Sequence, residues 1–264
     1  MRYLVKLSYS GAEFCGWQVQ PDAPSVQQTL EQALSTLLRT PVSVTGAGRT
    51  DTGVNAIGYI AHFDAAGGLD THQLCYKLNA ILPRSVVIHE IVPTAPDFHA
   101  RFDATRREYT YFLHRVKDPF LDAFSYLYTF PGVDFERMNE AAQALLGRHD
   151  FRCFEKTGAD SKTSLCTVTQ AAWQRYTPTH LALTGRAGGD DYWYFRISAD
   201  RFLRNMVRAV VGTLLEVGRG KRSAGDFASL VLPPDYEGTA PMRSLAGESV
   251  PGHALFLSGV DYRA

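Results

Sequence analysis

The chain has 264 residues, which is enough to bury a core and to form one large domain or two small ones. Its 27 basic and 27 acidic residues give a formal net charge of zero, which argues against a uniformly basic nucleic-acid binder and leaves room for local basic segments. The N-terminal segment lacks a signal-peptide layout and no apolar stretch has the length of a membrane span, so we expect a cytoplasmic protein without membrane contact.

The first hundred residues predict two helices alternating with three strands. Apolar and polar residues alternate over residues 1–9, as in a strand. Ser25 and Gln28 have the spacing of a capping box at the start of a helix over residues 24–38. The same criteria predict a strand over 56–64, a helix over 70–83 and a strand over 85–93. This order favours a mixed sheet with helices on one face.

The second part of the chain repeats this theme less regularly. We expect strands over residues 106–115, 166–176, 180–187, 192–198 and 254–262, and helices over 134–147, 200–218 and 223–231. The similar element order predicts two related α/β halves with a cleft between their sheets. We divide them into a first subdomain, residues 1–100, and a second, residues 101–264.

The four cysteines, Cys15, Cys75, Cys153 and Cys166, show no metal-binding pattern. None has C-x-x-C spacing, and no histidine pair stands near them at zinc-finger spacing. We therefore expect free thiols and no structural metal.

A glycine-rich segment, "GAGRTDTG", surrounds Asp51 and places Arg49 two residues before it. A phosphate-binding P-loop is excluded, because Ser43 stands at the position of its first glycine and Arg49 at that of its lysine. A dinucleotide-binding G-x-G-x-x-G is excluded as well, because Asp51 stands at its third glycine. Two alternatives stay open: a tight turn, and a dimeric aspartic protease that draws one D-T-G from each subunit.

Two further segments combine arginine with apolar or aromatic residues. In "RREYTYFLHR", Tyr109 and Tyr111 fall on one face of a strand among arginines, which suits either a core strand or base stacking beside phosphate. In "RFLRNMVRAVVG", the residues Arg201, Arg204 and Arg208 fall on one arc of the predicted helix. That arc is either a solvated face or a surface that contacts phosphate and carboxylate.

Five segments in chain order resemble the signature segments of the TruA-type tRNA pseudouridine synthases. They are "YSGAEFCGWQVQP", "GAGRTDTGVNAIGYIAHF", "LNAILP", "FHARFDATRREYTYFL" and "FLRNMVRAVVGTLLEVGRGK". A weaker match, "SVPGHALFLSGVDY", covers the closing strand. Asn55 departs from a histidine that is usual in the family, and Ala254 departs from a glycine.

The resemblance implies two ferredoxin-like halves whose mixed or antiparallel sheets form a continuous platform, with helices on one face and a central catalytic cleft. It also implies a homodimer that binds tRNA and isomerises uridine to pseudouridine at positions 38–40 of the anticodon stem-loop, without a cofactor or metal. A non-catalytic RNA-binding protein of the same fold is the alternative function.

The resemblance assigns roles to four side chains. Asp51 is the catalytic carboxylate, either as nucleophile at C1′ or as the base that removes the C2′ proton. Arg208 pairs with it, and Tyr109 stacks on the flipped uracil. Arg49 enters the space that the flipped nucleotide leaves. Arg204, from the arginine arc described above, is expected to contact phosphate. The glycines at positions 46, 48 and 53 are expected to let the RNA backbone approach closely.

Overall fold

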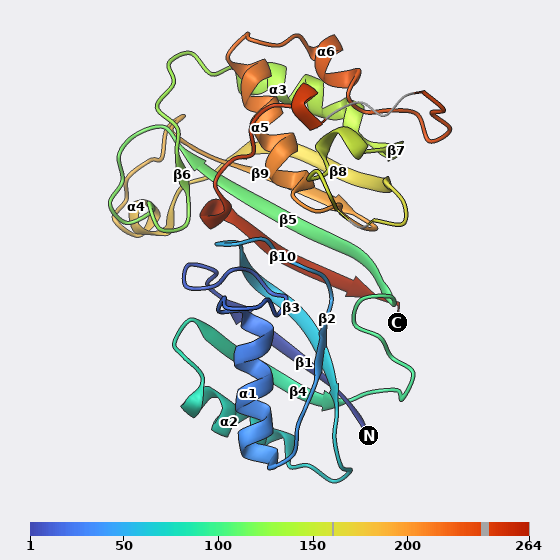
Figure 1. Ribbon diagram of the computed structural model, residues 1–264. Coiled ribbons are helices and arrows are strands. Elements are labelled where there is room, and N and C mark those ends of the chain that lie inside the picture. Colours follow the sequence, from blue (N-terminus) through green and yellow to red (C-terminus); the bar gives the residue numbers. More distant parts are fainter. Residues whose placement is uncertain (160, 239–242, 264) are drawn as a thin grey trace. The chain divides into compact units, whose positions relative to one another are not determined.

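The computed structural model describes residues 1–159, 161–238 and 243–263, and its chain divides into two compact units (Figure 1). The first unit is Met1–Arg107 with Phe256–Ala264, and the second is Glu108–Leu255. Each boundary falls inside a strand, either β5 (Ala104–His114) or β10 (Leu255–Tyr262). The division of the sequence at residue 100 follows element order, and that domain assignment stays a prediction.

The first unit has the β-α-β-β-α-β order of a ferredoxin-like fold. Its strands lie in the order β4-β1-β3, and β2 pairs with β3 on the other side. The pairings of β1 with β3 and β4, and of β2 with β3, are all antiparallel. Its elements are β1 (Arg2–Tyr9), α1 (Val26–Leu38), β2 (Val44–Gly46), β3 (Asn55–Asp64), α2 (Thr71–Ile81) and β4 (Val86–Pro93). The ferredoxin-like order is therefore confirmed here, and β10 adds a short parallel pairing to β3.

Local signals in the sequence account for the two helices of this unit. The Ser25 side chain accepts a hydrogen bond from the backbone N–H of Gln28, and Asp70 caps α2 through Gln73 in the same way. The helices contact each other, and α2 packs on β4 (Figure 1). Both helices bury apolar side chains, as do alternate residues of β1, and these side chains form the core of the unit.

The second unit repeats the first five elements of this order as β5, α3, β8, β9 and α5, with insertions between them. Its strand order is β5-β9-β8-β7, and β6 pairs with β5 in parallel. Helices α3 and α5 pack on each other, and α3 also packs on β8. The remaining bounds are β6 (Tyr126–Leu127), α3 (Phe135–Ala142), β7 (Gly147–Asp150), β8 (Leu165–Arg175), α4 (Thr179–Leu183), β9 (Tyr192–Ala199), α5 (Met206–Gly218) and α6 (Ala224–Ala228). The mixed α/β class predicted from the sequence is confirmed.

The predicted strand over residues 180–187 is wrong, because this segment begins as the short helix α4. The backbone N–H groups of Leu181 and Ala182 both donate to the carbonyl of Pro178, as in a helical turn. The alternating leucines resembled a strand, but Leu183 is 82% exposed and its apolar side chain does not mark a buried face.

The long helix predicted over residues 200–218 is too long at its N-terminal end. Asn205 has a left-handed backbone, with φ of 66°, and α5 begins at the next residue, Met206. A left-handed residue interrupts the helical hydrogen-bond ladder, so residues 201–204 do not share a helical face with Arg208. The short strands β2, β6 and β7 were not predicted. Within the described residues, no helix is long and apolar enough to cross a bilayer.

Candidate functional site

Asp51 lies in the loop between β2 and β3, where it is half-buried, and Arg49 beside it is exposed. Thr50 connects this loop to the core of the first unit through two hydrogen bonds. Its hydroxyl lies 2.9 Å from the hydroxyl of Tyr9 in a buried hydrogen bond, and its carbonyl accepts from the N–H of Trp17 at 3.3 Å. Fixed neighbours reduce the conformational freedom of Asp51, which is the condition that a preorganised catalytic group requires.

The "DTG" sequence forms a turn that needs its glycine. The N–H of Val54 donates to the carbonyl of Asp51 at 3.1 Å, which closes the four-residue turn. Gly53, its third residue, has φ of 76°, which an L side chain adopts only with strain. The Gly53 N–H in turn donates to the carbonyl of Phe14 at 3.3 Å. The expected tight turn is therefore present, and it holds the carboxylate at its first position.

Gly46 and Gly48, both expected to let the RNA backbone approach, have different surroundings. A Cβ at Gly46 would lie 2.1 Å from the Tyr59 hydroxyl and 2.6 Å from the Trp17 ring. These two rings stack with centroids 4.1 Å apart, so Gly46 makes room for the core. A Cβ at Gly48 would meet no atom within 4 Å, so packing does not require a glycine there.

Tyr109, on β5 in the second unit, is half-buried, and its ring meets Phe202 edge-on at 5.1 Å. Tyr111 follows two residues later on the same strand face but is fully buried. Burial raises the pKa of the Tyr111 hydroxyl well above its usual range. Of the two tyrosines that the sequence placed on one face, only Tyr109 is exposed enough to meet a ligand.

Arg208 lies in the first turn of α5 and is held by the segment near residue 250. Its Nε donates to the carbonyl of Val250 at 2.7 Å, and the N–H of Val250 donates back to the Arg208 carbonyl at 3.2 Å. Asn205, at the start of the helix, donates to the Ser249 hydroxyl at 2.6 Å. The first of these bonds orients the guanidinium, and the other two hold the start of α5 against the segment at residues 249–250.

Arg204 and Arg201 lie outside α5, so the predicted single arc of three arginines is wrong. Arg204 is exposed, and its carbonyl accepts from the N–H of Lys156 at 3.0 Å. Arg201 is half-buried and donates to the carbonyl of Thr163 at 2.9 Å. The side chain of Arg204 is therefore the better placed of the two to contact a phosphate in solvent.

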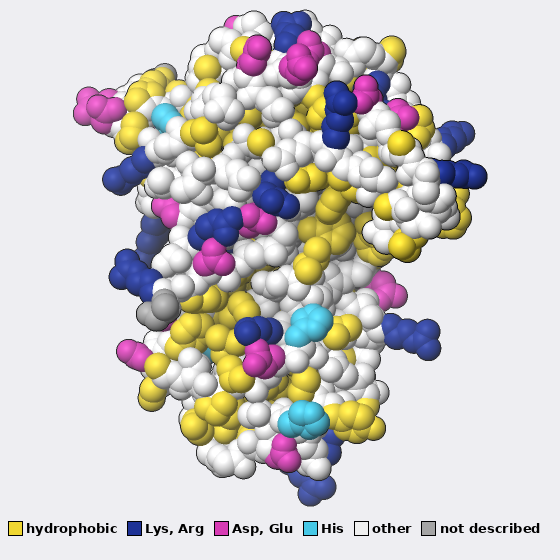
Figure 2. All heavy atoms as spheres, turned by 180° about the vertical axis from the view of Figure 1, so that it is seen from behind, with side chains coloured by type: hydrophobic (Ala, Val, Ile, Leu, Met, Phe, Trp, Pro, Cys, Tyr) yellow, Lys and Arg dark blue, Asp and Glu magenta, His cyan; other side chains and the backbone are white. Residues whose placement is uncertain are grey.

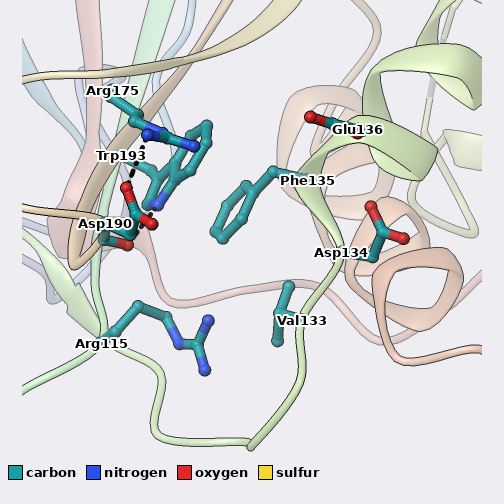
Figure 3. A pocket seen from close by; sticks show the side chains of 8 residues that line it. All are labelled: Arg115, Val133, Asp134, Phe135, Glu136, Arg175, Asp190 and Trp193. Carbon is teal, nitrogen blue, oxygen red and sulfur yellow. Dashed lines mark hydrogen bonds and ion pairs between the residues drawn. The ribbon is translucent and has the colours of Figure 1, made fainter.

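None of these residues lines a hollow of about 220 Å³ in the second unit (Figure 3). Phe135 and Trp193 both line it and stack on each other with centroids 3.8 Å apart. Arg175 pairs with Asp190 at 2.6 Å, and Arg115 donates to two backbone carbonyls. Both arginines therefore already have partners, which favours a structural groove at the start of α3 over a ligand site.

Metal ligation finds no support among the residues that the structure describes. No group of three His, Cys, Asp or Glu side chains there could hold an ion. All four cysteines are free, and Cys153 and Cys166 are buried. Burial raises the pKa of the Cys153 thiol to about 11 and that of Cys166 to about 12, so neither is a reactive thiolate.

Comparison with known proteins identifies the family. A family model described as tRNA pseudouridine synthase matches residues 7–103 and 141–263. The chain belongs to the tRNA pseudouridine synthase family. Its relatives include tRNA pseudouridine synthase A of Porphyromonas gingivalis, 48% identical over 99% of this chain and 97% of that protein. The protein of the same name from Bacillus licheniformis is 37% identical over 99% of both chains.

The segments matched by the family model include Asp51 and Arg208, while Tyr109 lies between them. Asn55, which departs from the usual family pattern, has a clear structural role. It is buried, and its side-chain oxygen accepts from the N–H of Gly11 at 2.8 Å. This bond joins the loop around Gly11 to the start of β3.

Two residues that support the Asp51 loop were not predicted from the sequence. One is Thr50, whose bonds to Tyr9 and Trp17 are described above. The other is Arg107 on β5, which donates through Nη2 to the carbonyl of Ala47 at 3.1 Å. Neither forms a recognisable motif, because their partners lie 41 and 60 residues away along the chain.

Proposed function

We propose that this protein isomerises uridine to pseudouridine at positions 38–40 of the tRNA anticodon stem-loop. The observation that carries the proposal is the Asp51 turn: a half-buried carboxylate on a loop that the fold anchors on both sides. Membership in the tRNA pseudouridine synthase family supports the reaction class. The named relatives support tRNA as the substrate.

The reaction breaks the bond from C1′ to N1 of uracil, turns the base and forms a bond from C1′ to C5. The proton on C5 leaves and N1 gains one, so atoms and electrons balance without an added cofactor. Asp51 acts either as the nucleophile at C1′ or as the base that takes the C2′ proton. Both roles require an ionised carboxylate held against the ribose, and the rigid turn meets this requirement.

Two aromatic and cationic side chains complete the proposed site. Tyr109 stacks on the uracil after it leaves the RNA helix, for which a half-buried ring is suited. Arg208 pairs with Asp51, because burial in a cleft disfavours a charged carboxylate unless a cation lies beside it. The bond from its Nε to Val250 fixes the guanidinium for this role.

Arg49 and Arg204 are the proposed contacts to the rest of the RNA. Both are exposed. Arg49, next to the anchored Thr50, enters the space that the flipped nucleotide leaves. Arg204 contacts backbone phosphate. We further propose that the enzyme works in the cytoplasm as a homodimer, so that one tRNA contacts both subunits.

Asp51→Asn tests the catalytic assignment. The substitution keeps the shape of the side chain and removes its charge, so we expect pseudouridine formation to fall by at least about a thousandfold, the order seen when a covalent or general-base group is lost. Affinity for tRNA is expected to stay within a few-fold. The assay incubates unmodified tRNA with the protein and maps pseudouridine by carbodiimide labelling and reverse-transcription stops. Full turnover by Asp51→Asn would remove Asp51 from the mechanism.

The same assay distinguishes the proposed enzyme from the alternative, a non-catalytic RNA-binding protein. That protein would bind tRNA as tightly but leave every uridine unchanged. The position of the reverse-transcription stops also tests the substrate site. Stops at positions 38–40 are expected, and stops elsewhere would contradict the anticodon stem-loop assignment.

A further inference from the structure

The segment 98–103, between β4 and β5 in the first unit, exposes a large aromatic ring. Phe102 is 73% exposed. A single exposed apolar residue needs no explanation, because folded proteins show many. The surroundings of this ring, however, have the chemistry of a binding site.

Two neighbours extend the ring into a small surface of aromatic and cationic groups. The His99 ring lies against Phe102 with centroids 4.3 Å apart and planes inclined by 32°. The guanidinium of Arg101, which is exposed, lies 5.6 Å from the Phe102 centroid. An aromatic face beside a guanidinium is the combination on which proteins stack unpaired bases, because every base has a π-face and an adjoining phosphate.

Hydrogen bonds within the turn hold this surface in place. The N–H groups of Arg101 and Phe102 both donate to Nδ1 of His99, at 3.2 and 3.3 Å. The His99 N–H donates to a carboxylate oxygen of Asp103 at 2.7 Å. An exposed ring whose backbone is fixed loses little entropy when a ligand stacks on it, which favours binding.

The turn is also fastened to the loop that carries Asp51. Ala100, fully buried beneath the turn, donates its N–H to Nδ1 of His62 at 3.1 Å and accepts from the Tyr262 hydroxyl at 2.7 Å. The Nη2 group of Arg107 donates both to the carbonyl of Arg101 and to that of Ala47. Ala47 belongs to the Asp51 loop, so one guanidinium sets the distance between the turn and that loop.

We propose that His99, Arg101 and Phe102 form a stacking platform for a second, unpaired base of the RNA substrate, separate from the uridine that reacts. This inference builds on the proposed function, because that function makes RNA the ligand. A base stacked here would be placed at a set distance from Asp51 through Arg107. The platform would thereby help to select which uridine enters the site.

The test combines two substitutions at Phe102 with a matched control. Phe102→Ala removes the stacking face, and we expect tRNA to bind on the order of tenfold more weakly. Phe102→Trp restores a face, so affinity is expected within about threefold of the parent, with the fluorescence of the added indole quenched by tRNA. Tyr76→Ala, at a ring equally exposed at 73% on α2, is expected to leave affinity unchanged. Thermal unfolding of each variant checks that the fold is retained.

The outcomes separate this proposal from the proposed function. Unchanged tRNA affinity in Phe102→Ala, or an indole in Phe102→Trp that tRNA does not quench, would overturn the platform while leaving pseudouridine formation intact. A parent protein that binds tRNA but forms no pseudouridine would overturn the function, and the loss of affinity in Phe102→Ala would still support the platform. A change of oligomeric state in Phe102→Ala, with tRNA affinity unchanged, would assign the ring to contact with a second copy and overturn the platform.

Discussion

At the scale of single residues, His62 shows how a buried polar group supports the Asp51 region. It is 5% exposed and accepts the Ala100 N–H through Nδ1, which requires that nitrogen to be unprotonated. Burial, followed by the positive charge of Arg2, lowers the pKa of His62 to about 4. The negative charges of Asp64 and Asp103 raise the pKa of His62, but their effect is smaller than that of burial and Arg2.

This lowered pKa predicts an acid-dependent loss of stability. The unfolded chain binds a proton at His62 below pH 6.5, and the folded chain does so only below about 4. The free energy of unfolding should therefore rise with pH between these values, and it should fall by up to about 3 kcal/mol as the pH drops through that window. Urea unfolding at a series of pH values measures this change.

His62→Asn is the matched variant for that measurement. Asparagine can present an oxygen close to the position of Nδ1, so it keeps an acceptor for Ala100 and does not titrate. We expect its unfolding free energy to vary less between pH 4 and 6.5 than that of the parent. An equally steep variation in His62→Asn would assign the pH dependence to other groups.

At the scale of elements, α5 illustrates what a helix pattern can and cannot reveal. Its apolar stripe is plain in the sequence, and the structure buries Val207, Val210 and Leu214 along it. The left-handed Asn205 that starts the helix is not signalled by this stripe. The reason is physical: periodicity reports which face is buried, whereas the first residue depends on contacts with the distant segment around Ser249.

Gly212 tests the contact between α5 and that segment. A Cβ there would lie 1.8 Å from the carbonyl oxygen of Glu248, so the backbone must move to admit one. Gly212→Ala should therefore lower the free energy of unfolding by about 1–3 kcal/mol, even though alanine is the better helix former. Gly225→Ala in α6 is the control. Its Cβ would come no closer than 3.7 Å to Ser223, and stability is expected to hold or rise. Equal effects of both substitutions would contradict the packing explanation.

At the scale of the whole molecule, the neutral net charge conceals an uneven distribution along the chain. Residues 201–222 carry six basic side chains and one acidic side chain, Glu216. On the face seen in Figure 2, basic side chains stand among acidic and hydrophobic ones in each unit rather than in one broad patch. On this face, RNA contact would therefore depend on a few positions and not on a general positive surface.

Arg204→Ala tests whether the basic segment contacts phosphate. If it does, the slope of log affinity for tRNA against log salt should flatten by about one unit, because one fewer counterion is released. Arg186→Ala is the control. It removes the same charge from another exposed position, four and five residues before Asp190 and Asp191 in the sequence, and should leave the slope unchanged. If Arg204→Ala leaves the slope unchanged, Arg204 does not contact phosphate and is an ordinary solvent-exposed side chain.

The sequence by itself determined the elements whose signals are local. Capping at Ser25 and Asp70, the alternation in β1 and the apolar stripe of α5 each involve residues a few positions apart. The ordered family segments determined the expected reaction. The turn at Asp51 could also be predicted from the sequence, because a D-T-G turn depends on the conformational freedom of its own glycine.

Only the tertiary structure decided which groups support that turn. Gly46 and Gly48 look alike in the sequence, yet one makes room for Trp17 and the other is open. Arg107 reads as one more arginine on a strand, yet it joins the Asp51 loop to the turn that exposes Phe102. These roles arise from contacts between residues far apart in the chain, and such contacts exist only once the strands have paired and the core has closed.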